Sequence, residues 1–370
     1  MIAIVYGTTG ELIKLAPVIL ELERRGHHPL LLCTGQQVQQ LPACADELGL
    51  PEVSLWLARG SGGHDLERKR EIPGWATRVA ASVARNRTRL RRQLTSDGRS
   101  PFVLVHGDTL TTVLGALAGR ALGVPVGHIE AGMRSGDWRN PFPEELNRRI
   151  AARLVELHFA PGPRAVANLR REAVRGEIID TGQNTIRDAV ALVGESVAPS
   201  IVVPDEPFGL VSLHRFELIE REAQFRPLLE LLHAHSRRQP LLFVDHSTTA
   251  SVIDRSPALS ALFDDRLRRI PRQPYLQFIA LLRRASFLVS DSGGSQEECA
   301  FLGIPCVIHR AVSEHDTGLD GSVLLSHLDL AVVRGFLDDP DRWRIPFGQT
   351  QSRPSERIVD ELARRGAVSR

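Results

Sequence analysis

Short stretches that are apolar at nearly every position alternate with longer segments of mixed polarity along most of the chain. The apolar stretches lie within residues 2–7, 29–35, 102–108, 125–132 and 156–162. Between the first two, Leu12, Leu15 and Ile19 have the spacing of an amphipathic helix, and further helices are expected from Thr111 and Glu144. Continuously apolar strands separated by helices indicate a parallel sheet covered on both faces. The pattern therefore predicts a doubly wound α/β fold.

A second series of the same kind follows a break in the pattern. Its apolar stretches lie within residues 208–215, 240–247, 285–294 and 304–310, with a helix expected near Ser295. The segment 193–207 between the two series holds three prolines and little periodicity, so it is expected to be an interdomain linker. We expect a Rossmann-like domain over 1–190, with the C-terminal helix 354–370 packing back on it, and a nucleotide-binding Rossmann-like domain over 191–353. Two such domains facing a cleft are typical of the GT-B organisation.

Length and charge narrow the class of protein. The chain has 370 residues, more than one core of about 250–300 residues usually holds. Lys plus Arg (46) nearly balances Asp plus Glu (44), so neither nucleic acid nor an acidic polymer is expected as a partner. The arginine-rich run from Arg85 is interpreted as a solvated helix face.

The four cysteines lack metal-binding spacing, and no apolar run reaches the ~20 residues that span a bilayer. No signal-peptide pattern is recognised. We expect a cytoplasmic protein without a metal.

Two βα junctions are candidates for binding anions. In the first turn, Gly7 and Gly10 permit a close backbone approach before a helix, and Lys14 lies one turn further along. Glycines are common in any such turn, so a plain connection is an equally good interpretation. The stretch DSGGSQEE from Asp291 is more specific, because a serine, two glycines and two acids come together where a helix opens. Its acids can also simply compensate the helix dipole, but the combination favours nucleotide binding.

Carboxylates at the ends of neighbouring strands supply candidate chemistry. Asp108 and Glu130 each follow an apolar strand, and Glu144 opens a helix after Pro143. Ligands of open α/β sheets bind beyond the carboxyl ends of the strands. Acids gathered there raise one another's pKa and suit general acid/base work. Taken singly, Asp108 is equally well a helix cap and Glu144 a first-turn acid.

Histidines accompany these acids. His214 ends the first strand of the second series and is followed by Arg215. A structural role and a role facing the ligand are about equally favoured for His214. His106 and His128 are interpreted as turn-packing residues.

The motifs together resemble those of the non-hydrolysing UDP-N-acetylglucosamine 2-epimerase family. The matching stretches are ELIKLAPV, VHGDTLTT, PVGHIEAGMRSGD, PFPEELNRR, YLQF and SDSGGSQEE, spread in family order over most of the chain. The resemblance implies a GT-B-like pair of Rossmann domains that bind a UDP-sugar. It further implies inversion of carbon 2 by elimination of UDP and its re-addition, without cofactor or metal, in an enzyme that is expected to be a homodimer.

The resemblance also implies roles for individual residues. The catalytic group would comprise Asp108, Glu130 and Glu144 as acid/base residues and His214 at the departing diphosphate. The substrate-binding group would comprise Lys14, Arg134 and Arg215. It would also include Gln273 and Phe278 in the uracil region, Ser292, Gly293 and Gly294 at the phosphates, and Glu298 at the ribose.

Two positions depart from the family pattern. Thr9 and His315 stand where the family has arginines that contact UDP or its phosphates. A charge-assisted contact contributes about 1.5–3 kcal/mol, so the hold on UDP is expected to be weaker unless Arg272 or Arg310 compensates.

Three functions therefore remain open. The first is a 2-epimerase of UDP-N-acetylglucosamine or a close variant, the second a hydrolysing relative that releases UDP and free sugar, and the third a catalytically silent nucleotide-sugar binding protein. The retained acids disfavour the third, and a GT-B glycosyltransferase would not need carboxylates crowded at carbon 2.

Overall fold

A computed structural model describes the chain except for residues 67, 137–141, 195–196, 320, 347–352 and 370. The chain divides into two compact units, Met1–Leu192 with Gln351–Arg370, and Val193–Thr350. Some predictions fall on the excluded positions: Asp137 and Pro141 of the matching stretches, residues 195–196 of the expected linker, residues 347–352 near the expected domain end and Arg370 of the expected C-terminal helix lie outside the described residues. No helix among the described residues is both long and apolar enough to cross a bilayer.

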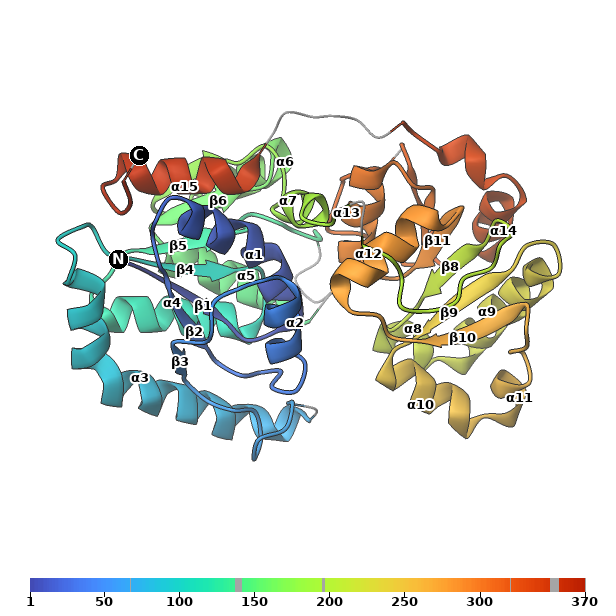
Figure 1. The fold of residues 1–370 in the computed structure, drawn as a ribbon, viewed down its shortest axis with the longest axis horizontal. Helices are drawn as coiled ribbons and strands as arrows, with labels where there is room; N and C mark the ends of the chain where they lie inside the picture. Colours follow the sequence, from blue (N-terminus) through green and yellow to red (C-terminus); the bar gives the residue numbers. More distant parts are fainter. Residues whose placement is uncertain (67, 137–141, 195–196, 320, 347–352, 370) are drawn as a thin grey trace. The chain divides into compact units, whose positions relative to one another are not determined.

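The first unit is built around a seven-stranded sheet with the order β3-β2-β1-β4-β5-β6-β7, in which every pairing is parallel (Figure 1). Its strands are β1 Ile2–Tyr6, β2 Leu30–Cys33, β3 Leu55–Trp56, β4 Phe102–His106, β5 Val126–Ile129, β6 Leu157–Ala160 and β7 Glu177–Asp180. Its α-helices are α1 Thr9–Arg24, α2 Leu41–Glu47, α3 Ile72–Thr95, α4 Leu110–Leu122, α5 Glu144–Leu154, α6 Pro163–Arg171, α7 Ile186–Ala191 and α15 Pro354–Arg364. A short 3₁₀ turn, Lys69–Glu71, precedes α3.

Helices cover both faces of this sheet. Helix α4 packs against both α3 and α5, and α1 packs against α2, α7 and α15 in a second group (Figure 1). Helix α4 approaches the sheet closely because Gly115 and Gly119 face it: a Cβ on Gly115 would lie 2.7 Å from Val105 Cγ1, and one on Gly119 would lie 2.4 Å from Val126 Cγ2. Bringing α4 this near fixes where its amino end, and the loop before it, lie beside the strand ends.

The second unit repeats the plan with a six-stranded sheet of order β10-β9-β8-β11-β12-β13, also parallel throughout. Its strands are β8 Gly209–Ser212, β9 Leu241–Asp245, β10 Leu267–Pro271, β11 Phe287–Ser290, β12 Cys306–Ile308 and β13 Val323–Leu325. Its α-helices are α8 Phe216–Ile219, α9 Glu222–Ser236, α10 Ser247–Arg255, α11 Pro257–Ser260, α12 Tyr275–Arg284, α13 Gly293–Leu302 and α14 Leu330–Asp338. A 3₁₀ turn covers Pro340–Trp343.

Phenylalanines fill the interior of this second unit. Phe225, Phe243, Phe287 and Phe336 are buried in one cluster, and the rings of Phe287 and Phe336 meet edge to face at 5.8 Å. Edge-to-face pairs contribute ~0.5–1.5 kcal/mol beyond their buried area. The cluster gives the second unit a core of its own.

Both sheets have a point where the chain reverses its direction of travel across the strands. In the first unit this point lies between β1 and β4, and in the second between β8 and β11. A crevice forms beyond the carboxyl ends of the strands at such a point, and ligands of open α/β sheets bind there. The predicted doubly wound parallel fold is confirmed, and each unit offers one such place.

Three helices begin earlier than their periodicity indicated, and capping side chains account for this in α1 and α13. Helix α1 begins at Thr9, where Thr8 and Glu11 form a capping box. Helix α4 begins at Leu110 rather than Thr111, and α13 begins at Gly293 rather than Ser295, since Ser292 Oγ accepts from the backbone N–H of Ser295. In α13 the two glycines are consequently helical and present their N–H groups at its amino end.

Candidate active site

The loops after β1 and β4 are joined by one buried carboxylate. Glu11 Oε2 accepts from the backbone N–H groups of Gly7 and Thr8, both at 2.9 Å. Its Oε1 accepts from Thr109 Oγ1 at 2.6 Å. Burial raises the pKa of Glu11 to about 7, although these donors act in the opposite direction. Glu11 therefore holds the first loop against the segment that carries Asp108.

Glu130 lies at the end of β5, in contact with side chains from two other parts of the unit. Its backbone φ is 69°, in the left-handed region, and the residue is 7% exposed. Lys14 of α1 forms an ion pair with Oε2, and the amide of Asn184, between β7 and α7, donates to the same oxygen. His106 Nε2 lies 3.7 Å from it. Lys14, predicted to bind substrate, thus contacts a predicted acid/base residue.

Asp108 is held by α5, the helix that begins at Glu144. The guanidinium of Arg148 pairs with Asp108 Oδ2, and Asn147 Nδ2 donates to the Asp108 carbonyl at 2.9 Å. Glu144 precedes Arg148 by four residues, so both lie on one face of the helix. Asp108 remains 23% exposed at its side chain.

Glu130 lies beside the same loop. A Cβ added to Gly107, the residue before Asp108, would be 3.9 Å from Glu130 Oε1. Asp108 and Glu130 therefore lie at the same edge of the sheet, and Glu144 opens the helix whose Arg148 pairs with Asp108.

Buried neutral histidines underlie these acids. Burial lowers the pKa of His106 and of His128 to about 4. His128 Nε2 lies 2.7 Å from the carbonyl oxygen of Gly107, to which its N–H donates. These contacts agree with the interpretation of both residues as turn-packing groups, and they shape the loop that precedes Asp108.

Arg134, predicted to bind substrate, contacts other side chains of the first unit. Its Nε and Nη2 donate to the two carboxylate oxygens of Glu172 at 2.8 and 2.7 Å, and Nη1 donates to the Met133 carbonyl. Glu145 of α5 lies 3.8 Å away. The guanidinium joins the loop after β5 to α5 and α6, and a substrate contact for Arg134 stays a prediction.

In the second unit, Asp291 joins the two loops at the switch point. Its carboxylate accepts from the backbone N–H groups of His214, at 3.0 and 3.1 Å, and of Arg215, at 2.9 Å. The ring of His214 packs on that of His246 with centroids 4.5 Å apart. Burial lowers the pKa of His214 to about 4, and the charges of Arg215 and Arg272 act in the same direction. His214 is consequently neutral at pH 7 and offers a hydrogen bond rather than a charge.

The amino end of α13 follows directly. Ser292 caps the helix, and a Cβ on Gly294 would meet only Ser292 Oγ, at 3.7 Å, so the space in front of this residue is open. Glu298 lies in the second turn and is 7% exposed. Free N–H groups, a hydroxyl and open space are what a phosphate needs. The arrangement can hold the diphosphate that was predicted for Ser292, Gly293 and Gly294.

His315 lies against this helix end. A Cβ on Gly293 would be 2.6 Å from His315 Cδ2 and 2.7 Å from its Nε2. His315 Nδ1 is 3.3 Å from Glu297, and Nε2 is 3.8 Å from Glu314. Arg310, considered as a replacement cation, is buried and pairs with Glu314 at 3.0 Å. His315, a predicted departure from the family pattern, therefore lies beside the predicted phosphate site.

The residues predicted near the uracil lie at the start of α12. Gln273 is 7% exposed; its amide donates to the Pro271 carbonyl at 2.7 Å and its oxygen accepts from Ser200 at 2.8 Å. Phe278 lies half-buried on the helix itself. Their role toward a base stays a prediction.

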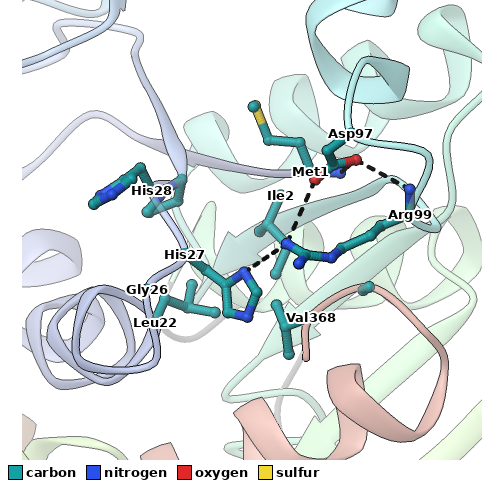
Figure 2. A pocket seen from close by; sticks show the side chains of 11 residues that line it. Met1, Ile2, Leu22, Gly26, His27, His28, Asp97, Arg99 and Val368 are labelled. Atoms are coloured by element: carbon teal, nitrogen blue, oxygen red, sulfur yellow. Dashed lines mark hydrogen bonds and ion pairs between the residues drawn. The ribbon is translucent and has the colours of Figure 1, made fainter. Parts of the chain in front are cut away.

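A small cavity lies elsewhere in the first unit (Figure 2). It is lined by Met1 and Ile2 where β1 begins, His27 and His28 before β2, Arg99 before β4, and Val368 after α15. Its position at the amino ends of the strands is opposite to where α/β sheets bind ligands. Among the described residues no group of His, Cys, Asp and Glu is suited to hold a metal ion.

Known proteins match the chain over nearly its whole length. The family model described as UDP-N-acetylglucosamine 2-epimerase matches residues 22–360. The chain belongs to this family. The UDP-N-acetylglucosamine 2-epimerase of Methanococcus maripaludis is 31% identical over 95% of each chain, and that of Salmonella typhimurium is 31% identical over 94% of this chain and 95% of its own. These relatives are isomerases, and the prediction of an epimerase-like isomerase is confirmed.

Solved structures of the family share the fold. The Methanocaldococcus jannaschii enzyme in complex with UDP-GlcNAc and UDP is 26% identical, with a TM-score of 0.75 over 98% of this chain and 99% of its own. The Neisseria meningitidis enzyme bound to UDP-GlcNAc is 25% identical, with a TM-score of 0.79 over the same shares. The prediction of a GT-B-like fold built from two Rossmann-type domains is confirmed.

Several residues of the site were not singled out from the sequence. Glu11, Arg148 and Asn184 each contact a predicted site residue or its loop. Asn184 directly follows a short turn after β7, and a polar residue at a strand's carboxyl end is a weak signal that could have found it.

Proposed function

We propose that the protein inverts carbon 2 of a UDP-activated amino sugar, converting UDP-N-acetylglucosamine to UDP-N-acetylmannosamine or a close variant. The observation that carries the proposal is the placement of Asp108 and Glu130 at the carboxyl edge of the first sheet, with Glu144 on the helix that contacts Asp108. Family membership and two relatives whose structures hold UDP-GlcNAc support the choice of substrate.

The proposed reaction is an elimination followed by an addition. A carboxylate takes the proton from carbon 2, the bond between carbon 1 and the diphosphate oxygen breaks, and UDP leaves with its electron pair. A protonated acid then delivers a proton to the opposite face of carbon 2 while UDP adds again to carbon 1. Three acids with different surroundings suit this exchange, because Glu130 is paired with Lys14 and Asp108 with Arg148.

The second unit holds UDP in this proposal. The first-turn N–H groups of α13 and Ser292 bind the diphosphate, Glu298 binds the ribose, and Gln273 and Phe278 lie at the base. Neutral His214 donates a hydrogen bond to the leaving diphosphate oxygen. Arg215 adds a positive charge near the same anion. We also propose a homodimer in the cytoplasm, which sedimentation equilibrium and fractionation would test.

A hydrolysing outcome is the second candidate, favoured by His315 at the amino end of α13. A weaker hold on UDP would let it escape before it adds again, so UDP and free sugar would accumulate. Retention of the three acids speaks against a silent binding protein.

One experiment separates the three functions. The protein is incubated with UDP-N-acetylglucosamine in deuterated water, and the sugars are followed by proton NMR. Epimerisation predicts an intact nucleotide sugar that carries deuterium at carbon 2, hydrolysis predicts UDP and free sugar, and a binding protein predicts no change. Asp108→Asn should abolish deuterium incorporation without lowering the melting temperature by more than a few degrees. Normal turnover by this variant would refute the role of Asp108.

A further inference from the structure

We infer that Asn184 is a positioning residue for Glu130: its amide fixes the direction of the carboxylate, while Lys14 balances its charge. The inference rests on the proposed function for its catalytic meaning and on geometry for the contact itself. Three segments that are far apart in sequence meet at one oxygen, because Lys14 comes from α1, Glu130 follows β5, and Asn184 lies between β7 and α7.

Both donors approach Glu130 Oε2, and the surroundings are buried. Asn184 is 3% exposed, Glu130 7%, and the Lys14 side chain 15%. A single donor on a carboxylate oxygen leaves the group able to turn about its last torsion. Two donors from different elements, with His106 Nε2 3.7 Å from the same oxygen, define the plane of the carboxylate. An amide N–H also stabilises the ionised form, since a neutral carboxyl accepts such bonds less well.

The backbone at Glu130 makes this support necessary. Residues other than glycine rarely adopt the left-handed conformation, and Glu130 has a φ of 69°. The Glu130 carboxylate lies beside the loop after β4, where a Cβ added to Gly107 would be 3.9 Å from its Oε1. Backbone strain of this kind is typical of functional positions, and the contacts from Lys14 and Asn184 hold the carboxylate there.

The two donors have separable effects. Lys14 carries a charge, so removing it changes the protonation of Glu130 together with its position. Asn184 is neutral, so its loss mainly frees the carboxylate to move. A freed base misaligned with carbon 2 lowers kcat and leaves KM nearly unchanged.

Asn184→Asp provides the sharper test, because it keeps the shape and replaces the donor with a second carboxylate. Two carboxylates within hydrogen-bond distance of each other share one proton, and this raises the apparent pKa of the pair. We expect the acid limb of the kcat profile to move up by about one pH unit or more. Asn184→Ala should lower kcat by ~10-fold or more without such a shift.

Asn168→Ala is the matched control. Asn168 is also buried, at 8% exposed, and its Nδ2 donates at 2.9 Å to the carbonyl of Gly132 in the same loop after β5, away from the Glu130 carboxylate. Its loss should lower the melting temperature and leave the pH profile in place. An unshifted profile in Asn184→Asp, or an equal shift in Asn168→Ala, would overturn the inference.

A second readout does not need turnover. In protein labelled with 13C at glutamate side-chain carboxyls, the Glu130 signal is assigned by its loss in Glu130→Gln and is titrated with pH. Asn184→Asp should move its midpoint upward, and an unchanged midpoint would contradict the contact. If the wild-type protein leaves UDP-N-acetylglucosamine unchanged while this midpoint still moves, the proposed function fails and the placement of Asn184 stands.

Discussion

Alanine substitutions at the adjacent residues Gly293 and Gly294 of α13 test two properties of this helix end separately. The first tests its contribution to folding stability, and the second tests its proposed binding of a diphosphate. At Gly293 the new Cβ would lie 2.6 Å from His315 Cδ2. The imidazole is 5% exposed and lies 3.3 Å from Glu297, so it has little room to retreat. Overpacking of this kind costs ~1–3 kcal/mol. We expect Gly293→Ala to lower the free energy of unfolding by about that amount.

Gly294→Ala should behave in the opposite way. Its Cβ would meet only Ser292 Oγ, at 3.7 Å, and its φ is not in the left-handed region. Such a substitution stabilises by ~0.4–1 kcal/mol through the unfolded chain. The methyl group would nevertheless occupy the open space before the helix end, so a diphosphate bound there must move away. We expect the affinity for UDP-N-acetylglucosamine to fall by ~10-fold, which corresponds to about 1.4 kcal/mol.

Urea unfolding measures the first quantity, and isothermal titration calorimetry with UDP-N-acetylglucosamine measures the second. The two variants serve as each other's control, since they differ by one position in the same helical turn. Wild-type affinity in Gly294→Ala would show that the diphosphate binds elsewhere. Wild-type stability in Gly293→Ala would show that the contact with His315 is wrong.

Three further predictions concern stability and charge. Gly7→Ala should lower the free energy of unfolding by ~1–3 kcal/mol, because its Cβ would lie 2.2 Å from the Thr34 hydroxyl. Gly10→Ala should raise it, because a Cβ there would meet nothing within 4 Å. Urea midpoints that move in the same direction for both variants would refute this. His315→Arg should tighten UDP-N-acetylglucosamine binding by ~10-fold in calorimetry, and unchanged binding would exclude residue 315 from the anion site. Burial lowers the pKa of His128 from 6.5 to about 4. Between pH 7 and pH 4 the unfolded chain therefore binds more protons than the folded one, so the free energy of unfolding should fall as the pH is lowered. The fall should be less steep in His128→Gln.

Much of the fold could be predicted because its signal is local. Strands buried on both faces are apolar throughout, and the turn residues between strands and helices mark their ends. The carboxyl ends of parallel strands share one edge, so Asp108 and Glu130 could be placed together before any coordinates were known. The DSGG stretch could likewise be placed where a helix opens.

The features that could not be predicted from the sequence depend on contacts between segments that are far apart in the chain. Gly7 and Gly10 look alike in sequence, yet one faces Thr34 and Thr111 while the other faces open space. Asn184 meets Glu130 across 54 positions of the chain. Spacing and periodicity carry no information on such pairs, because packing of the strands and helices decides them.

The breaking and re-forming of the bond between carbon 1 and the diphosphate oxygen is the step on which the proposed mechanism depends. UDP-N-acetylglucosamine labelled with 18O in that bridging position is incubated with the protein, and the recovered nucleotide sugar is examined by 31P NMR. If UDP leaves and adds again, the label spreads to the non-bridging oxygens of the β-phosphorus, and Asp108→Asn prevents the spread. Inversion at carbon 2 with the label still confined to the bridge would contradict it.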